Sequence, residues 1–347
     1  MNFPYDAYLI AVVGATLTSL GTLPLWRRWC VRVGLVDDPG HRKIHDERIP
    51  LAGGLTVMTG LLVPTIFAAI ALWATGAGSH ATPTDAGSHQ VSNSGIGPGE
   101  SSTAYFLGYG LNKRVLELAG ILAGAIGMLL VGCLDDKIEL SPRVKFSGQF
   151  LFAALVAASG VRITLFVPSL VFSYGITILW IVTLINAFNF MDNMNGLCGG
   201  LGAIGAGYFA LVAALDAQYL VAVIAFLTFG ALLGFLPYNF PRARAFLGDS
   251  GSHLVGYLLA VLAILPHFYN AKHPHRWAVL IPLLVLAVPL FDMVWVVLLR
   301  WRIGQPFYQG DNNHLSHRLV RQGLSRTQAV LAIWLAAAAV GCVALFL

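Results

Sequence analysis

The chain has 347 residues, of which 57% are hydrophobic and 11% carry a charge. Soluble domains carry about 25% charged residues, so this composition excludes an ordinary soluble domain and indicates a polytopic membrane protein. The formal net charge of +5 comes without a basic segment interleaved with aromatic residues, which excludes a typical nucleic-acid binder. The four cysteines are widely spaced and form no CxxC pair, so no zinc site or disulfide framework is expected.

Apolar segments follow one another along most of the chain, and a helix needs about 20 such residues to cross a bilayer. Ten candidate spans are expected at residues 7–26, 52–75, 115–134, 144–161, 168–188, 197–215, 217–236, 250–267, 277–299 and 327–347. The expected fold is therefore all-α: a polytopic membrane helical bundle of about ten transmembrane helices with short cytoplasmic catalytic loops. Residues 1–347 form a single integral-membrane domain in this interpretation.

The basic residues predict the orientation of this bundle. Most of the 21 lysines and arginines fall in the loops and helix ends on one side of the ten segments. Since short loops rich in Lys and Arg stay inside, the N-terminus is expected outside. The inside loops are then 27–51, 135–143, 189–196, 237–249 and 300–326. Residues 76–112, rich in Gly, Ser, Thr and Pro, are expected to form a flexible external loop.

The first inside loop contains the stretch DDPGHRKIHDERIPLAGG. Its Arg42, Lys43 and His45 side chains are cationic donors suited to phosphate oxygens. The alternative is a simple positive-inside anchor, which explains the basic residues but not the Gly53-Gly54 pair at the next helix.

The second inside loop, in VGCLDDKIELSPRVKFSGQF, places Asp135 and Asp136 side by side at the end of an apolar run. Carboxylates are costly beside hydrocarbon, and two at a helix C-terminus oppose the helix dipole, so a plain helix cap is a weak explanation. Such a pair can bind Mg²⁺ or act on a phosphate. Because adjacent residues face different directions on a helix, the two acids are expected to have different roles. Lys145 can extend to the interface and meet a lipid phosphate.

The third inside loop, NAFNFMDNMNGL, carries amides and one acid at steps of about three residues. Asn186, Asn189, Asp192 and Asn195 could thereby line one face of a helix end and bind Mg²⁺ or a sugar nucleotide. An Asn-rich helix end that stops at Gly196 is the alternative.

The fourth inside loop, NFPRARAFLGDSGSHLVG, places Asp249 between glycines ahead of an apolar segment. Small neighbours allow a ligand to approach closely, so metal binding is favoured over a simple N-cap. His253 is expected to be a buried packing residue.

The fifth inside loop ends in GDNNHLSHRL. If a helix begins near Asp311, His314 and His317 share one face, with Arg318 beside them, and these side chains can neutralise a pyrophosphate. A zinc site is not expected, because no third ligand stands at metal spacing. Asp292 is an intramembrane acid and therefore a further site candidate.

With these motifs in this order, the sequence resembles the polyprenyl-phosphate N-acetylhexosamine-1-phosphate transferases of glycosyltransferase family 4. The resemblance covers about residues 35–320. The RKIH stretch and the His-x-x-His-Arg pattern are closer to the undecaprenyl-phosphate GlcNAc-1-phosphate branch. The phospho-MurNAc-pentapeptide branch is the alternative.

The resemblance implies a reaction at the cytoplasmic face of the bacterial inner membrane. An N-acetylhexosamine-1-phosphate group, expected to be GlcNAc-1-phosphate, would pass from a UDP-sugar to undecaprenyl phosphate. UMP would leave, and the lipid-pyrophosphoryl-sugar would serve cell-envelope glycopolymer synthesis. The implied cofactor is Mg²⁺, with Mn²⁺ as an alternative, and a homodimer is left open.

The resemblance also implies roles for the candidate residues. Asp135 would lie nearest the lipid phosphate with Asp136 beside it, and Lys145 would hold that phosphate. Asp249 and Asp192 would serve Mg²⁺. Nucleotide positioning would fall to Asn189 and Asn239, and contacts with the diphosphate or sugar to His314, His317 and Arg318.

Four positions depart from the family pattern: Asn193, where Gly is frequent, Asn312, where Arg is frequent, and two more. Asn195 stands where the family usually has a second aspartate, and Ser316 stands where it usually has a histidine. These departures motivate a second hypothesis, a relative that binds lipid phosphate without turnover. A transporter is the third, but transporters place ionisable groups near the bilayer midplane, whereas here they gather at one face.

Overall fold

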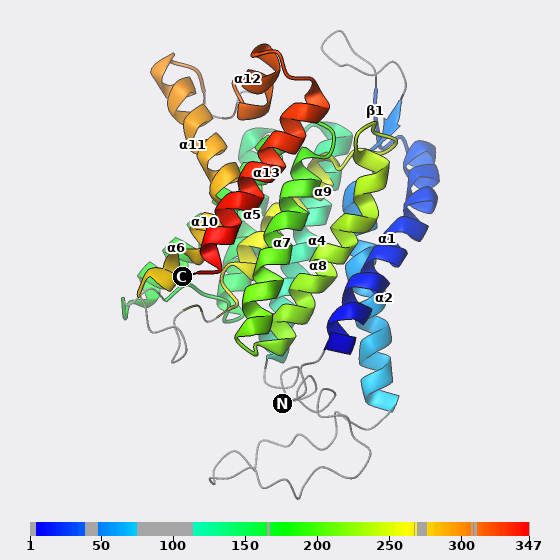
Figure 1. Cartoon of the computed structure of the whole chain (residues 1–347), viewed down its shortest axis with the longest axis vertical. Coiled ribbons are helices and arrows are strands. Elements are labelled where there is room, and N and C mark those ends of the chain that lie inside the picture. The colour runs from blue at the N-terminus through cyan, green and yellow to red at the C-terminus, as the bar shows by residue number, and fades with distance from the viewer. Residues whose placement is uncertain are drawn as a thin grey trace, which may run out of the picture.

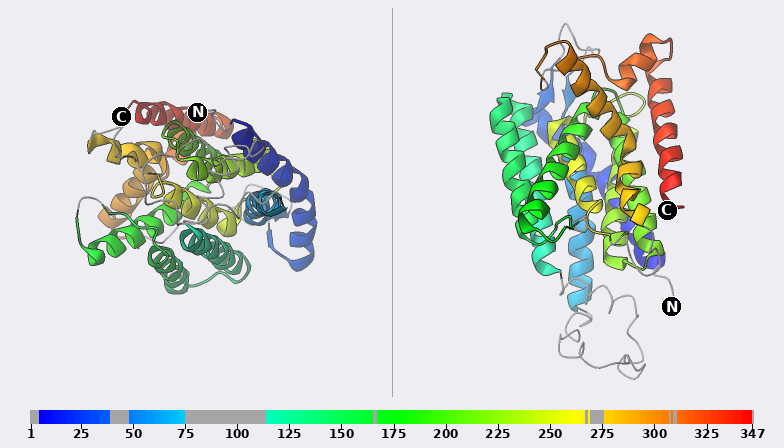
Figure 2. Two further views of the ribbon diagram at one scale, coloured as in Figure 1. Left: turned by 90° about the horizontal axis from the view of Figure 1, so that it is seen from below. Right: turned by 90° about the vertical axis from the view of Figure 1, so that its left-hand side faces the viewer.

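The computed structural model describes residues 5–38, 48–74, 114–164, 167–266, 268, 276–306, 308 and 311–346. It is a bundle of long helices that run roughly along one axis (Figure 1). The C-terminus and the start of the first helix lie towards one end, and β1 and α12 lie at the other (Figures 1 and 2). The expected external loop at 76–112 and the candidate residues Arg42, Lys43 and His45 lie outside the described residues.

The helices and strands have the following bounds. The longer helices are α1 (Tyr5–Val33), α2 (Gly53–Ala74), α4 (Val115–Ile138), α5 (Pro142–Ala158), α6 (Leu170–Met191), α7 (Leu197–Leu215), α8 (Tyr219–Asn239), α9 (Gly248–Leu262), α11 (Ala287–Arg302) and α13 (Arg326–Ala344). The shorter helices are η2 (Arg276–Leu280), α10 (Ile281–Val285) and α12 (Leu315–Arg321). Strand β1 (Val36–Asp37) pairs antiparallel with β2 (Ile49–Pro50).

Each of the ten predicted spans contains a helix, and the all-α membrane bundle is confirmed. By length and apolar composition, 7 of the described helices can cross a membrane. An eighth span results if the segments 277–285 and 287–302 count as one, although they meet at a bend of 73°. Helices α5 and α9 have 17 and 15 residues and are shorter than predicted. The orientation of the bundle in the membrane stays a prediction.

Helix α9 is the central helix of the bundle, and every side chain from Ser250 to Leu262 is buried. It packs against α2, α4, α6 and α7, and the end-on view shows it enclosed by other helices (Figure 2). At 1.5 Å per residue it is about 22 Å long, which is less than the thickness of the hydrocarbon core. Because its side chains are buried, residues 250–262 pack against protein rather than lipid. The N-terminus of α9 lies at the end of the bundle near β1.

Two glycines on neighbouring helices let the first turn of α9 come unusually close. A Cβ atom on Gly132 of α4 would lie 2.3 Å from the Cα atom of Ser250. A Cβ atom on Gly54 of α2 would lie 2.7 Å from the backbone nitrogen of Gly251. Since real Cβ atoms do not approach backbone this closely, only glycine fits at these positions. The close contacts bring the polar ends of α4 and α9 together.

We expect Gly132→Ala to destabilise the protein, because the added methyl group must push α4 away from α9. Overpacking of this kind costs about 1–3 kcal/mol. The measurement is the thermal unfolding midpoint of the full chain purified in detergent. Gly175→Ala on α6 is the matched control, since nothing lies within 4 Å of its added Cβ atom, and its midpoint should be unchanged or higher. Equal midpoints for the two variants would show that the α4–α9 contact is not tight.

Candidate active site

A polar cavity of about 1060 Å³ opens at the end of the bundle where β1 and α12 lie. Its walls come from the β1–β2 segment, the end of α4, the end of α6, the α8–α9 connection, α12 and the start of α13. The acids that line it are Asp37, Asp38, Asp135, Asp136, Glu139, Asp192 and Asp249. The expected convergence of distant loops on one place is thus observed for the described residues.

Lys145 connects two of these acids from the side of α5. Its Nζ atom lies 2.6 Å from Asp135 Oδ2 and 3.1 Å from Asp249 Oδ2. The Asn189 amide donates to the other carboxylate oxygen of Asp249 and also lies 3.0 Å from Ser252 Oγ. Two carboxylates this close repel each other unless a cation lies between them. The Lys145 ammonium supplies that cation and joins α4, α5 and α9 at one point.

Asp136 points to a different partner from its neighbour Asp135. Its carboxylate accepts hydrogen bonds from the backbone N–H groups of Asp249 at 2.7 Å and Ser250 at 3.0 Å. These N–H groups lie in the first turn of α9, where a negative charge is stabilised by the helix dipole. Gly248 has φ +72°, and a Cβ atom there would lie 2.8 Å from Asp136 Oδ2. Asp136 therefore caps α9 and fixes the position of Asp249.

Asp192 ends α6 and lines both this cavity and a second one described below. Burial raises the pKa of its carboxyl group to about 8, and the negative charges of Asp249 and Asp136 add to this effect. A hydrogen bond from the Gly248 backbone N–H acts in the opposite direction. The raised pKa reflects negative charges that are not balanced by nearby positive charge. A cation bound beside these carboxylates would lower the pKa again.

A second cavity of about 680 Å³ adjoins the first and shares Asn189, Asp192, Asn193 and His317 with it. On its wall, His314 Nδ1 lies 2.7 Å from Asp292 Oδ2, and the other oxygen of Asp292 accepts the backbone N–H of Leu315 at 2.6 Å. Asp292 thus caps α12 and fixes the His314 ring. The sequence indicated Asp292 as a candidate, but nothing in the sequence indicated its partner.

An ion pair between a buried arginine and a partly buried aspartate lines the second cavity. Arg300 Nε lies 2.8 Å from Asp311 Oδ2, and the guanidinium group lies 4.9 Å from the centre of the Phe190 ring. Burial alone would raise the pKa of the Asp311 carboxyl group. The Arg300 hydrogen bond and the Asn313 backbone N–H outweigh this effect and lower the pKa. Sequence reasoning missed Arg300, although an arginine within an apolar helix requires a partner.

His314 and His317 come together as expected, with ring centres 6.5 Å apart. The helix begins at Leu315 rather than near Asp311, and His314 is its N-cap. Burial lowers the pKa of His317, and the nearby His314, Arg321 and Arg326 lower it further. Arg318 lies 4.8 Å from the centre of the Trp295 ring and is not among the residues that line either cavity.

The remaining asparagines have structural partners. Asn186 lies one turn deeper in α6 than Asn189, and its amide donates to Gln149 Oε1 at 2.7 Å. Asn195 lines the first cavity and donates to the backbone oxygen of Pro241 at 3.3 Å. Asn239, which is buried, accepts the Gly196 N–H and donates to the Ala245 carbonyl. It therefore ties the α6–α7 turn to the α8–α9 connection.

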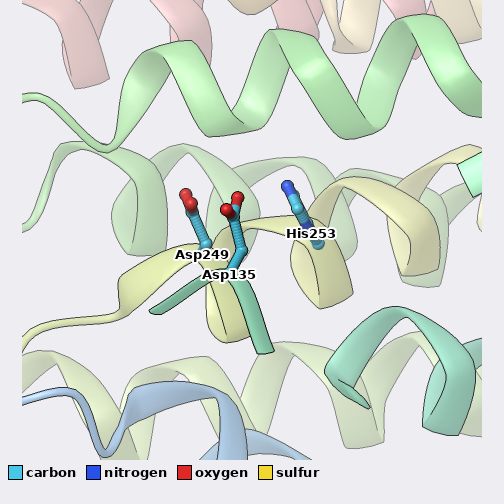
Figure 3. A group of neighbouring side chains, drawn as sticks. All are labelled: Asp135, Asp249 and His253. Carbon is cyan, nitrogen blue, oxygen red and sulfur yellow. The ribbon is translucent and has the colours of Figure 1, made fainter. Parts of the chain in front are cut away.

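The ligand atoms of three residues lie close enough together to hold a metal ion. Asp135, Asp249 and His253 each offer one atom, and these atoms lie within 4.8 Å of one another (Figure 3). Carboxylate oxygens are the ligands that Mg²⁺ and Mn²⁺ prefer, so the acids fit the expected cofactor. His253 is fully buried, as expected, but its ring faces these acids.

Comparison with known proteins agrees with the sequence motifs. The family model described as Glycosyl transferase family 4 matches residues 118–267. A probable undecaprenyl-phosphate N-acetylglucosaminyl 1-phosphate transferase of Bacillus subtilis (strain 168) is 31% identical in an alignment of 342 residues that covers 95% of this chain and 83% of that protein. The chain belongs to glycosyl transferase family 4.

Two further relatives support this assignment to family 4. A decaprenyl-phosphate N-acetylglucosaminephosphotransferase of Mycobacterium tuberculosis (strain ATCC 25618 / H37Rv) is 31% identical over 94% of this chain and 79% of that protein. An undecaprenyl-phosphate alpha-N-acetylglucosaminyl 1-phosphate transferase of Escherichia coli (strain K12) is 27% identical over 90% of this chain and 76% of that protein. The resemblance stated from the motifs is thus confirmed.

We expect Asp136→Ala to loosen the first turn of α9 in this family 4 protein. Two N–H groups lose a charged acceptor, which costs about 1–2 kcal/mol. Hydrogen–deuterium exchange should accelerate at residues 249–250. Asp38→Ala is the control, since the exposed Asp38–Arg48 ion pair contributes little. Unchanged exchange at 249–250 in Asp136→Ala would contradict the capping role.

Proposed function

We propose that the chain transfers GlcNAc-1-phosphate from UDP-GlcNAc to undecaprenyl phosphate, with release of UMP. The observation that carries this proposal is the pair Asp135 and Asp249, which line the large polar cavity and are bridged by the Lys145 ammonium. The relatives described above have GlcNAc transfer to a polyprenyl phosphate in their names. The phospho-MurNAc-pentapeptide alternative is not favoured by these names.

The acceptor would approach along α5. This helix carries Lys145 near its start, and its exposed side chains Val144, Phe150 and Leu151 form an apolar surface. A polyprenyl chain could lie on that surface within the hydrocarbon while its phosphate reaches the Lys145 ammonium. A compact ammonium on a flexible stem suits a phosphate at the membrane interface.

The donor would occupy the large cavity. Its volume of about 1060 Å³ is at the upper end of the range for small-molecule sites. Arg242 and Arg326 line it and supply positive charge for a diphosphate, and the His317 ring lines it as a further hydrogen-bonding group. Asn189, Asn193 and Asn195 line it as well and offer amides to the polar parts of a nucleotide sugar.

A divalent cation, Mg²⁺ with Mn²⁺ as an alternative, belongs to this proposal as the cofactor. Asp249 and Asp192, which interact electrostatically at the end of the cavity, would hold it. When bound, such an ion neutralises charge on the diphosphate and stabilises the departing UMP. We also propose that this end of the bundle faces the cytoplasm of the bacterial inner membrane, because the basic residues gather there.

The chemistry is proposed as a direct displacement. An oxygen of the lipid phosphate attacks the β-phosphorus, the bond to the α-phosphate breaks, and UMP takes the electron pair. A covalent aspartyl intermediate is less favoured. Asp135 would be its nucleophile, yet one of its oxygens lies 2.6 Å from Lys145 Nζ and the other accepts the Leu140 N–H at 2.8 Å. Oxygens that already accept such donors are weaker nucleophiles.

The proposal predicts that purified protein with undecaprenyl phosphate, Mg²⁺ and labelled UDP-GlcNAc moves the label into the lipid phase, and that EDTA stops the transfer. Lys145→Gln should lower the rate by about 10²–10³-fold, because a buried phosphate partner is lost. Arg143→Gln removes the same charge from an exposed position two residues away on α5 and should change the rate less than about threefold. No transfer with any UDP-N-acetylhexosamine would overturn the proposed function.

The direct displacement predicts that labelled UMP does not exchange into UDP-GlcNAc unless undecaprenyl phosphate is present. The measurement is chromatographic separation of the two nucleotides after incubation with protein and Mg²⁺. Exchange that persists without lipid in the wild type and disappears in Asp135→Asn would establish a covalent intermediate instead. A preparation with Asp249→Asn reports any contaminating exchange activity.

A further inference from the structure

The polar face of α9 continues one turn below the carboxylates. His253 follows Asp249 by four residues, so both side chains lie on one side of the helix. Figure 3 shows Asp135, Asp249 and His253 pointing to that same side. The His253 side chain is 0% exposed, and neither of its ring nitrogens has a hydrogen-bond partner in the part of the chain that the structure describes.

A buried imidazole without partners is costly. An unsatisfied buried polar group destabilises a protein by about 1–3 kcal/mol, and an apolar side chain of similar size would avoid that cost. Neutral imidazole carries one N–H donor and one nitrogen lone pair. The orphaned ring of His253 therefore indicates a ligand that the protein atoms do not provide.

The surroundings of the ring define the chemistry of that ligand. A ring nitrogen of His253 and carboxylate oxygens of Asp135 and Asp249 all lie within 4.8 Å of one another. Ligand bonds of about 2.0–2.3 Å place pairs of ligands roughly 3–4.5 Å apart around one ion. A small closure of these side chains would therefore allow them to meet at one divalent cation.

At present the Lys145 ammonium occupies the place of that cation between the carboxylates, 2.6 and 3.1 Å from their Oδ2 atoms. An ammonium group and a metal ion would compete for the same oxygens. A metal ion that displaced the ammonium would leave Lys145 available to an anion beside Asp135 and Asp249. Loss of the Lys145 ammonium should therefore tighten metal binding, whereas loss of a metal ligand would weaken it.

A second orphaned group is found one turn from Lys145. Gln149 is fully buried, and its side-chain nitrogen has no hydrogen-bond partner among the described residues. Because Gln149 follows Lys145 by four residues on α5, it lies on the same face of that helix. A water ligand of the ion could accept its hydrogen bond. A water molecule without any metal is the competing explanation for both orphaned groups.

We propose that His253 is a nitrogen ligand in a divalent-cation site with Asp135 and Asp249, and that it gives the site a preference for Mn²⁺ over Mg²⁺. Mg²⁺ strongly prefers oxygen ligands, whereas Mn²⁺ binds imidazole more readily. This inference rests on the proposed function and shares Asp249 with the cation site named there, but it takes Asp135 and His253 rather than Asp192 as the other ligands. Metal binding can nevertheless be measured without turnover.

The test uses the full chain in detergent, without substrates, titrated with Mn²⁺ and followed by electron paramagnetic resonance. Electron spin-echo modulation of the bound ion should contain the ¹⁴N pattern of a coordinated imidazole. His253→Leu should remove the pattern and weaken Mn²⁺ binding by about 10-fold or more, as expected for loss of a ligand. Mg²⁺ affinity, measured by competition, should change less than threefold.

Three further variants complete the test. His253→Gln preserves a polar side chain and should lose the nitrogen pattern, which separates ligation from packing. Tyr257→Phe removes a buried hydroxyl one turn further along α9 and should keep the pattern. Lys145→Gln should tighten Mn²⁺ binding, because the competing ammonium is absent. Thermal unfolding without metal checks that each variant is folded.

Either of two results overturns the inference: a wild-type spectrum without imidazole nitrogen, or a pattern that persists in both His253 variants. The first result assigns the orphaned ring to a water molecule. Transfer activity with either metal in the absence of the nitrogen pattern would contradict only this inference. A clear nitrogen pattern without transfer from any UDP-N-acetylhexosamine would contradict only the proposed function.

Discussion

One ammonium group between two carboxylates holds the polar end of the molecule together. Lys145 and Asp249 are 104 residues apart in sequence, and Asp135 comes from a third helix. Removing the positive charge would leave two carboxylates close together at the edge of hydrocarbon, where the cost of separation from water is high. The end of the bundle therefore requires a cation at this point, whichever cation it is. The same cation that stabilises the fold at this point can also attract a phosphate, because it lies beside a polar cavity.

The burial of α9 gives this cation site a rigid base. Close contacts at Gly54 and Gly132 fix the first turn of α9 against α2 and α4, and Asp136 caps that turn through two backbone N–H groups. Asp249 follows directly in the capped turn, so its carboxylate has little freedom. Preorganised charges of this kind need not reorganise when a substrate binds. Electrostatic stabilisation by such charges is usually the largest contribution that an enzyme makes to phosphoryl transfer.

The sequence predicted the helices and the convergence of their loops, because apolar runs and basic loops follow directly from the membrane. It did not predict that α9 is enclosed by protein, since an apolar residue has the same character whether it faces lipid or another helix. It also predicted different roles for Asp135 and Asp136 without saying which acid caps a helix. The Asp292–His314 pair was missed because α11 follows a bend of 73°, and neither periodicity nor spacing indicates which side chains such a bend brings together.

The side chains around the two cavities are held in place by different kinds of contact. Around the larger cavity, backbone contacts and a helix cap fix Asp249. Around the smaller one, two side-chain contacts tie α11 to the residues at the start of α12: the buried hydrogen bond between Asp292 and His314, and the ion pair between Arg300 and Asp311. Loss of one partner would leave a buried polar or charged group unpaired. The two histidines are therefore positioned by polar contacts with α11. Since both cavities include Asp192, a charge bound in either of them acts on the same carboxylate.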